Sequence, residues 1–397
     1  MNLPQAFIER TRQLLGEEQY PAFQEALATE VPVSIRPNRK KCDLPVEGEA
    51  VPWAPSGVYL KSRPTFTFDP LFHAGCYYVQ EASSMFVERV LREYVKDPVV
   101  MLDLCAAPGG KSTLCRSALP EGSLLVANEV MRNRSQILAE NLVKWGSPEV
   151  IVTNNDPADF TDLTHLFDVI LTDVPCSGEG MFRKDQVAVD EWSIENVDIC
   201  WQRQRRILTD IWPSLKPGGL LIYSTCTFNR EEDEDNVAWI ARELGAEVLP
   251  VSIEEGWGIT GNLTGGGFPV YRFLPHKTKG EGFFLAALRK RADGCDETPS
   301  RFLKTPSRMD KKKKGKDAKQ PLSVPREAKD WLKEADAFNL TLNGTSVVAF
   351  PKAHAEVYAF LGQQLKVIHA GITLGEIKGK DLIPHHSLAM STALASE

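Results

Sequence analysis

The sequence predicts an α/β protein whose main domain is a mostly parallel β-sheet with helices on both faces. The main evidence is the alternation, between residues 99 and 288, of short apolar runs with segments of helical spacing, a pattern typical of strand–helix–strand units. The predicted strands are VVMLDL, SLLVANE, EVIVTN, FDVILTD, GLLIYST and EGFFLAAL. The content of 43% hydrophobic and 25% charged residues is ordinary for a soluble globular protein, and a length of 397 residues allows two or three domains.

Helices are expected between the first several of these strands, over residues 111–118, 132–145 and 197–215. Before the sheet, residues 1–94 should form a small N-terminal α/β domain. Helical spacing at its start gives way to a proline-rich stretch of loops and short strands, and an amphipathic helix over 82–95 then leads into the main domain.

The main domain is expected to span residues 95–290. The polar, basic and proline-containing segment that follows, residues 291–325, predicts a flexible linker. Residues 326–397 mix strand and helix patterns and form a last module. The chain ends with no evident final strand or cap, so this module is either incomplete or unusually small.

Composition excludes several classes of protein. No run of 18 apolar residues exists, which excludes a transmembrane helix. Glu9, Glu17 and Glu18 stand where a signal peptide would need an apolar stretch, which predicts a cytosolic protein. The 8 cysteines form no Cys-x-x-Cys pair, so no metal site is expected and the thiols should be reduced.

The net charge of -7 conceals a basic tract. Between Arg289 and Lys316 there are 11 Lys or Arg residues against 4 Asp or Glu residues, so the rest of the chain is strongly acidic. A run such as Lys311 to Lys314 is more typical of a solvated linker than of a nucleic-acid site.

The segment VVMLDLCAAPGGKST, residues 99–113, joins a predicted strand to a helix through a Pro-Gly-Gly turn. Gly109 and Gly110 allow a sharp turn and the close approach of a ligand, as in nucleoside-cofactor sites. A plain strand–turn–helix corner is an alternative. A phosphate-binding P-loop is another, but its first glycine would fall at Cys105, so that match fails.

Acidic residues follow the next two predicted strands. Glu129 comes after SLLVA, and a carboxylate at this place can accept hydrogen bonds from ribose hydroxyls. Asp156, after the third strand, stands where the adenine end of the same ligand would lie. Taken alone, such residues are more often surface or helix-capping residues, but their register with the glycine turn favours a binding role.

Two later strands each deliver a cysteine at the carboxyl end, where open parallel sheets place their ligands. In DVILTDVPCSGEGMFRKD the strand ends at Asp173, and Pro175 predicts an extended loop that exposes Cys176. In LKPGGLLIYSTCTFNREEDEDNV the strand ends beside Cys226, and the acidic run 231–235 should open the next helix, where it complements the helix dipole.

Together, CAAPGGK, DVPCSG and STCTFNREEDEDNV resemble the Nop–Sun family of RNA cytosine-C5 methyltransferases over roughly residues 70–290. The resemblance implies a Rossmann-like core that uses S-adenosylmethionine. The N-terminal stretch and the last module resemble the bacterial RsmF-like branch, which modifies 16S ribosomal RNA. That closer resemblance implies an RNA-recognition domain over residues 1–94 and a PUA-like α+β RNA-binding module over residues 326–397.

The resemblance also implies roles for individual residues. The cofactor loop would comprise Cys105, Ala106, Ala107, Pro108, Gly109, Gly110 and Lys111, with Glu129 on the ribose, Asp156 on the adenine and Asp173 between cofactor and base. The nucleophile corresponds to Cys226, and Cys176 corresponds to a second cysteine that helps to release the product. Spacing alone leaves this assignment open, because DNA enzymes with the same chemistry use the cysteine of the Pro-Cys motif, here Cys176.

The chemistry explains why such residues are needed. Cytosine C5 is a poor nucleophile until a thiolate adds to C6 and makes C5 enamine-like. A carboxyl group that protonates N3 would aid the addition, which predicts a protonated Asp173. Lys111 is a candidate positive neighbour for the thiolate.

The target base must leave its stack, so a single-stranded or readily opened RNA is expected as partner, by resemblance 16S rRNA or the 30S subunit. Candidate RNA contacts are Arg36, Arg39, Lys40, Lys41, Arg183, Lys184 and the basic linker, each also explained by a solvated surface. Tyr77 and Tyr78 are candidates for stacking on a base, although aromatic residues there are more typical of a core. The chain is expected to be a monomer.

Other functions are also considered: the same chemistry on tRNA or another RNA, a P-loop nucleotidase, and a catalytically silent RNA-binding protein. Cys105 argues against the nucleotidase. A silent protein would be expected to lack Cys226, Asp173 or the glycine turn, and the sequence contains all three.

Overall fold

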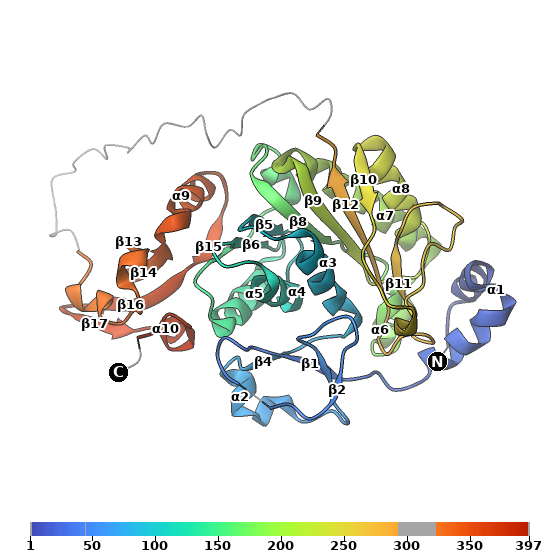
Figure 1. Cartoon of the computed structure of the whole chain (residues 1–397), viewed down its shortest axis with the longest axis horizontal. Helices are drawn as coiled ribbons and strands as arrows, with labels where there is room; N and C mark the ends of the chain where they lie inside the picture. Colours follow the sequence, from blue (N-terminus) through green and yellow to red (C-terminus); the bar gives the residue numbers. More distant parts are fainter. Residues whose placement is uncertain (1, 44, 293–322, 396–397) are drawn as a thin grey trace.

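The computed structural model describes residues 2–43, 45–292 and 323–395. Within these ranges the chain forms a four-stranded N-terminal sheet, a nine-stranded central sheet and a four-stranded C-terminal sheet (Figure 1). Most of the predicted linker, residues 293–322, lies outside the described residues.

The N-terminal part begins with helix α1 (Gln5–Leu27), which bends at Gly16, where φ is 80° and ψ is 163°. Its buried face, which includes Phe7 and Phe23, packs against Phe182 and Phe228 of the main domain. The sheet that follows has the order β2-β3-β1-β4. Its elements are β1 (Ser34–Pro37), β2 (Glu49–Ala50), β3 (Val58–Tyr59) and β4 (Tyr77–Val79), with η1 (Phe66–Phe68) and α2 (Pro70–His73) before β4.

The central sheet has the order β10-β12-β9-β8-β5-β6-β7-β15, with β11 paired to β12. The five strands from β9 to β7 are parallel, and the others are antiparallel. The bounds are β5 (Val100–Asp103), β6 (Leu124–Asn128), β7 (Val150–Thr153), β8 (Phe167–Asp173), β9 (Leu215–Thr225), β10 (Ala246–Leu249), β11 (Tyr271–Phe273), β12 (Phe283–Lys290) and β15 (Val367–Ala370). All six predicted strands are present, and the predicted α/β fold class is confirmed.

Helices cover both faces of this sheet. The helices α3 (Phe86–Tyr94), α4 (Gly110–Ala118) and α5 (Arg132–Trp145) pack on one face, and α7 (Ile194–Ile211), α8 (Glu234–Glu243) and α9 (Ala355–Gln364) pack on the other. Side chains alternate accordingly, since Leu125 and Ala127 belong to one apolar core while Leu124 and Val126 belong to the other. The remaining elements are η2 (Ser83–Met85), η3 (Pro157–Phe160), η4 (Glu179–Met181), α6 (Gln186–Glu191), η5 (Trp212–Ser214) and η6 (Glu255–Trp257).

The helix predicted over residues 197–215 ends earlier than expected. α7 stops at Ile211, a short turn that contains Pro213 follows, and Leu215 already belongs to β9. Proline cannot donate its backbone nitrogen to a helical hydrogen bond, which explains the early end.

The C-terminal part contributes to two sheets. Its own sheet has the order β13-β14-β16-β17, while β15 pairs with the edge strand β7 of the central sheet. Its other elements are η8 (Arg326–Lys329), η9 (Ala335–Ala337), β13 (Phe338–Asn343), β14 (Ser346–Pro351), η10 (Lys352–His354), β16 (Ile372–Lys378), β17 (Asp381–Pro384) and α10 (His386–Met390). The predicted domain limits and the PUA-like character of this part stay predictions.

Over the described ranges, none of the helices is long and apolar enough to cross a membrane. The same residues contain no group of three or more His, Cys, Asp or Glu side chains arranged to hold a metal ion.

Candidate active site

A cavity of about 340 Å³ lies at the carboxyl ends of the central parallel strands. The loops after β5, β8 and β9 meet there because these strands are neighbours, and the register pairs Asp103 with Leu171 and Asp173 with Ser224. The described residues that line the cavity include Tyr78, Glu81, Cys105, Ala106, Ala107, Pro108, Gly110, Lys111, Asp173, Lys184, Cys226, Glu281 and Phe283. The structure thus brings together the cofactor loop, Asp173 and Cys226, as the sequence predicts.

The two cysteines of the later motifs lie side by side. The Sγ atoms of Cys176 and Cys226 are 3.1 Å apart. The hydrogen bond with Cys226, together with burial, raises the pKa of Cys176 well above the usual range of a thiol. Cys176 therefore keeps its proton near neutral pH and can donate it in a hydrogen bond to the Cys226 sulfur. Since Cys226 is also the one of the two that lines the cavity, this geometry favours Cys226 as the attacking group.

Asp173 forms an ion pair with Lys111. Lys111 Nζ lies 2.8 Å from Asp173 Oδ2, and Ser224 Oγ donates to Asp173 Oδ1 at 2.8 Å. Burial lowers the pKa of Lys111, but the Asp173 and Cys226 side chains more than offset this, so the pKa is raised overall. The ion pair places the Lys111 ammonium group beside Asp173; the protonated Asp173 expected from the chemistry stays a prediction.

Two buried carboxylates tie the cysteine loops to each other. Glu179, three residues beyond Cys176, accepts hydrogen bonds from Thr227 Oγ1 at 2.6 Å and from the backbone nitrogen of Phe228 at 2.7 Å. Glu232, beyond Cys226, accepts from the backbone nitrogen of Ser177 at 3.0 Å. The loop after β8 therefore supplies a carboxylate that holds the loop after β9, and the loop after β9 supplies one that holds the loop after β8. These contacts keep the two sulfur atoms close together.

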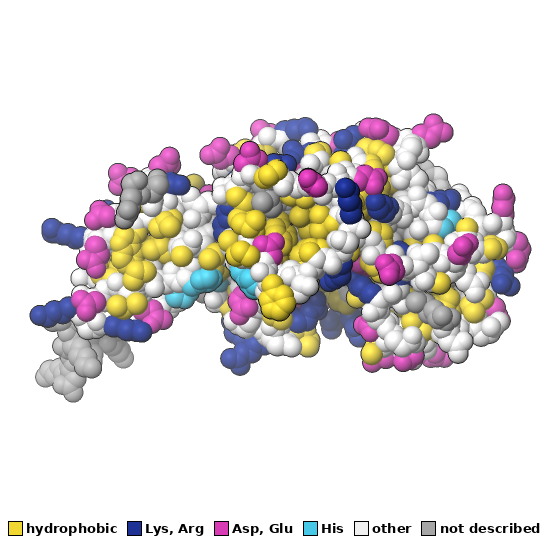
Figure 2. Space-filling view, turned by 90° about the horizontal axis from the view of Figure 1, so that it is seen from below, with side chains coloured by type: hydrophobic (Ala, Val, Ile, Leu, Met, Phe, Trp, Pro, Cys, Tyr) yellow, Lys and Arg dark blue, Asp and Glu magenta, His cyan; other side chains and the backbone are white. Residues whose placement is uncertain are grey.

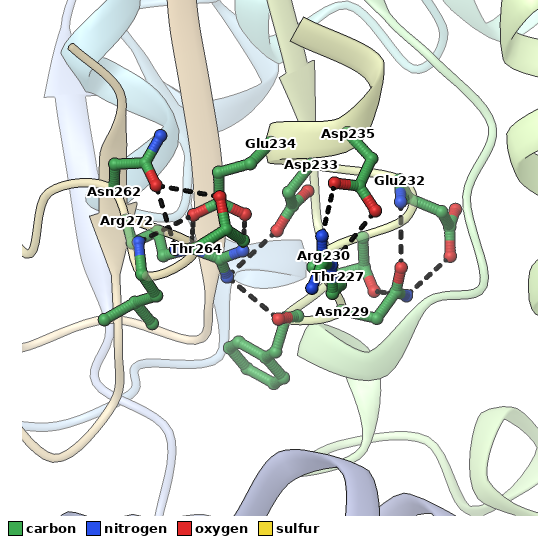
Figure 3. A network of polar contacts seen from close by, with 12 residues as sticks. Thr227, Asn229, Arg230, Glu232, Asp233, Glu234, Asp235, Asn262, Thr264 and Arg272 are labelled. Atoms are coloured by element: carbon green, nitrogen blue, oxygen red, sulfur yellow. Dashed lines mark hydrogen bonds and ion pairs between the residues drawn. The ribbon is translucent and has the colours of Figure 1, made fainter. Parts of the chain in front are cut away.

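The acidic run 231–235 opens α8 as predicted, with Glu234 and Asp235 in the first turn, and it has a second role. α8 begins only at Glu234, and Glu232, Asp233 and Glu234 are all buried. The buried Arg272 of β11 pairs with Asp233 Oδ2 at 3.0 Å and with Glu234, and it donates to the carbonyl oxygen of Phe228 at 2.8 Å (Figure 3). These carboxylates stabilise the loop after Cys226 rather than only the helix dipole.

The glycine turn leaves room for a nucleoside cofactor. Gly109 caps α4 with φ of 113°, a conformation that favours glycine. A Cβ atom at Gly110 would lie 3.3 Å from Tyr78 Cε1 and would crowd the cavity. Burial raises the pKa of Cys105 well above the usual range, so this cysteine is a poor candidate for a thiolate.

The two acidic residues predicted for the cofactor lie outside the described lining of this cavity. Glu129 is buried and accepts from the backbone nitrogen of Met131 at 2.9 Å. Asp156 caps η3 by accepting from the backbone nitrogen of Ala158 at 3.1 Å. Val130 and Met131, directly after Glu129, are each 52% exposed. An uncovered apolar pair beside a carboxylate suits a purine with its ribose hydroxyls, so these residues fit S-adenosylmethionine.

The basic residues singled out from the sequence have different surroundings. Arg36 is fully buried, where it donates to Gln80 and Thr113 and stacks on Trp145, so the prediction that it contacts RNA is wrong. Arg39 pairs with Asp43, and Lys40 is exposed. Lys41 and Arg183 donate to backbone carbonyls. Lys184 pairs with Glu281 at the cavity.

The tyrosines of β4 divide between core and cavity. Tyr77 is buried and donates to Asp69, whereas Tyr78 is part of the cavity lining.

Sequence reasoning missed the structural roles of the buried Glu179, Glu232 and Arg272. Only the density of acidic residues after Cys226 gave a signal, because their partners come from distant segments.

Comparison with known proteins gives consistent matches. Residues 91–289 match a family model described as 16S rRNA methyltransferase RsmB/F, and residues 3–82 match one described as the N-terminal domain of 16S rRNA methyltransferase RsmF. The protein named ribosomal RNA small subunit methyltransferase F from Cronobacter sakazakii is 32% identical over 350 residues, which are 86% of this chain and 71% of that protein. Its namesake from Aliivibrio fischeri is 32% identical over 91% of this chain and 75% of its own length.

Solved structures agree with this fold. A methyltransferase homolog protein from Pyrococcus horikoshii superposes with a TM-score of 0.62 at 30% identity, over 72% of this chain and 95% of that one. A structure described as NSun6 from the same organism with SFG has a TM-score of 0.62 at 23% identity, over 72% of this chain and 98% of that one, and supports the fold alone.

Proposed function

The chain belongs to the 16S rRNA methyltransferase RsmB/F family, and from this premise we propose that it transfers a methyl group from S-adenosylmethionine to C5 of a cytosine in 16S rRNA. The observation that carries the proposal is the pair of sulfur atoms 3.1 Å apart, one of which lines a cavity that it shares with Lys111 and Asp173. A cofactor-binding protein without this chemistry has no need of such a pair.

Cys226 is the nucleophile in this proposal. Its thiolate adds to C6 of the cytosine, the electron pair moves toward N3, and a proton reaches N3 from the Lys111–Asp173 pair beside it. C5 is then nucleophilic enough to accept a methyl group, which the sulfonium of S-adenosylmethionine supplies when that cofactor is bound.

Release of the product reverses the addition. A base removes the proton from C5, the electron pair reforms the C5–C6 double bond, and the bond between C6 and the Cys226 sulfur breaks. The proton on N3 returns to the Lys111–Asp173 pair. Cys176 assists this step, because its protonated thiol can hydrogen-bond the departing sulfur at the observed spacing of 3.1 Å.

The cofactor is held by the loop from Cys105 to Lys111, with Glu129 on the ribose and Asp156 near the adenine. The substrate is 16S rRNA, either free or within the 30S subunit, and the enzyme acts as a cytoplasmic monomer without a metal ion. The N-terminal part and the C-terminal part supply RNA contacts.

A trapping assay tests the reaction. Wild type, Cys226→Ala and Cys176→Ala are incubated with S-adenosylmethionine and 16S rRNA that carries 5-fluorocytosine, because fluorine at C5 blocks the final elimination. We expect a covalent protein–RNA band on a denaturing gel for wild type and Cys176→Ala, and none for Cys226→Ala.

Two outcomes contradict the proposal in different ways. Loss of the band in Cys176→Ala alone would reverse the roles of the two cysteines. No band with any variant, when 16S rRNA and 30S subunits have both been supplied, would exclude the reaction on this substrate.

A further inference from the structure

A second hollow, of about 420 Å³, separates the N-terminal sheet from the C-terminal part of the chain. One wall carries Lys40 and Lys41, which follow β1, and Ala74 and Cys76, which follow α2. The other wall carries Lys333 and residues 389–392, 394 and 395, which include the end of α10. We call this hollow the lysine cleft.

The charge of the lysine cleft is opposite to that of the whole protein. The described residues that line it include three lysines and no aspartate or glutamate, although the chain has a net charge of -7. Lys40 and Lys333 are exposed and come from opposite walls. Positive charge concentrated in a concave surface of an acidic protein is typical of a site for a polyanion.

The two walls are held together at the base of the cleft. Lys41 Nζ donates to the carbonyl oxygens of Ala74 at 2.9 Å and Lys144 at 2.6 Å, and the backbone nitrogen of Thr392 donates to the carbonyl oxygen of Gly146 at 3.0 Å. Gly146 ends α5 with φ of 92°, and a Cβ atom there would lie only 2.3 Å from the carbonyl oxygen of Met390. The spacing of the walls is therefore built into the fold.

An uncovered aromatic ring lies on the segment that leads into this cleft. Phe68 is 86% exposed, whereas the neighbouring rings of Phe66 and Phe72 pack on Tyr77. Figure 2 shows the underside of the molecule, on which hydrophobic side chains lie exposed beside Lys, Arg and His side chains. An exposed ring on the segment that leads to Ala74 and Cys76 of the cleft wall suits single-stranded nucleic acid, because unpaired bases stack on aromatic side chains while lysines contact phosphates.

We propose that the lysine cleft binds the sugar–phosphate backbone of the RNA substrate away from the target cytosine, with Lys40 and Lys333 on phosphates and Phe68 under an unpaired base. This inference rests on the proposed function for the identity of the RNA. An acidic protein partner could pair with the lysines, but an isolated exposed ring such as Phe68 would add little to its binding. The surface therefore suits RNA better than an acidic protein.

Charge reversal in the full-length protein tests the cleft. The variants are Lys40→Glu, Lys333→Glu and Phe68→Ala, and the matched control is Lys352→Glu, an exposed lysine of η10 outside the cleft. The measurements are filter binding of a 16S rRNA fragment over a range of salt concentrations, and calorimetric binding of S-adenosylmethionine.

We expect Lys40→Glu and Lys333→Glu each to weaken RNA binding about tenfold at ~0.1 M salt, and to reduce the slope of log K against log salt by about 1. Phe68→Ala should weaken binding by about fivefold with the salt slope unchanged, since stacking releases no counterions. The affinity for S-adenosylmethionine should stay at the wild-type value, and the control should bind RNA as wild type does.

Equal RNA binding by the two charge-reversal variants and by wild type would overturn the proposal. So would an equal loss in Lys352→Glu, since that would indicate a general charge effect. RNA binding is measured separately from methyl transfer. A wild-type protein that binds the RNA without methylating it would contradict the proposed function. The relative RNA affinities of the variants would still show whether the lysine cleft binds RNA.

Discussion

Cys176 Sγ lies 3.1 Å from Cys226 Sγ although the two residues are 50 positions apart in the sequence. The contact exists because β8 and β9 are neighbouring parallel strands that end in register, with Asp173 opposite Ser224. One sulfur keeps its proton and the other lines the cavity. The pair is therefore a nucleophile with a proton donor beside it.

Removal of the second thiol should separate attack from release. Cys176→Ala should still attack ordinary cytosine, but the covalent protein–RNA complex should accumulate and turnover should fall about 100-fold, the usual size of a lost acid–base contribution. The measurement is a denaturing gel alongside steady-state methyl transfer. Cys200→Ala, at a buried cysteine of α7, is the control and should turn over normally. Turnover by Cys176→Ala at the wild-type rate would contradict the role of Cys176 in release.

Loss of the ammonium group at the cavity should slow the chemical step. Lys111→Met removes the ion pair with Asp173 and the positive charge near Cys226. We expect methyl transfer in a single turnover to fall about 100-fold, because preorganised charge at a reacting centre contributes about that much. The matched control is Lys216→Met, which breaks the Lys216–Asp168 ion pair of 2.6 Å at the opposite end of the sheet. An equal loss in both variants would indicate a stability effect.

The buried carboxylate of Glu179 should be needed for both stability and rate. Glu179→Gln replaces one acceptor oxygen with an amide NH2 group, which would face the donor groups of Thr227, Phe228 and Trp192. We expect a loss of about 2 kcal/mol in the free energy of unfolding, typical of hydrogen bonds to a charged group. The covalent trapping rate should fall with it, since the Cys226 loop loses its support. Denaturant titration and trapping measure the two effects, and Glu191→Gln, at an exposed residue of α6, should change neither.

The sequence predicted much of this site because its signals are local. Strand, turn and cysteine follow one another within a few residues, as in the segments that contain Lys111, Cys176 and Cys226. A parallel sheet then brings such segments to one edge without further information. The same reasoning placed all six predicted strands of the central sheet.

The rest depends on contacts between distant segments. Arg36 reads as part of a basic cluster with Arg39 to Lys41, but Gln80, Thr113 and Trp145 surround it in the fold. Glu232 reads as one acid in a run, yet its partners include Ser177. Likewise β15 joins the central sheet at β7 from the far end of the chain, and no local pattern announces such a pairing.

A buried acid behind the cofactor loop should make stability depend on pH. Burial raises the pKa of Asp103 to about 7, although a hydrogen bond from Ser112 partly opposes this. The folded protein then keeps a proton that the unfolded chain loses near pH 3.8, so the free energy of unfolding falls as pH rises from about 4 to about 7. Above pH 7 the loss is complete.

Asp103→Asn should remove this dependence. Both proteins are measured without cofactor. The unfolding temperature of wild type minus that of Asp103→Asn should fall between about pH 4 and pH 7 and stay constant above pH 7. Thermal unfolding at a series of pH values measures the difference. Asp97→Asn, at an exposed position, should follow wild type throughout. Parallel pH profiles for wild type and Asp103→Asn would contradict the assignment.

The docking of the C-terminal part should depend on Gly146. Gly146→Ala would suffer backbone strain at φ of 92° and a clash with the carbonyl oxygen of Met390, whereas Gly245→Ala has similar strain at φ of 69° but open space around the new methyl group. The strain alone costs about 1–2 kcal/mol. We therefore expect Gly245→Ala to lose this amount of stability and Gly146→Ala to lose more. Only Gly146→Ala should show faster amide hydrogen exchange in α10 and weaker RNA binding. Equal exchange in α10 for the two variants would mean that the close contact between Gly146 and Met390 does not hold the lysine cleft together.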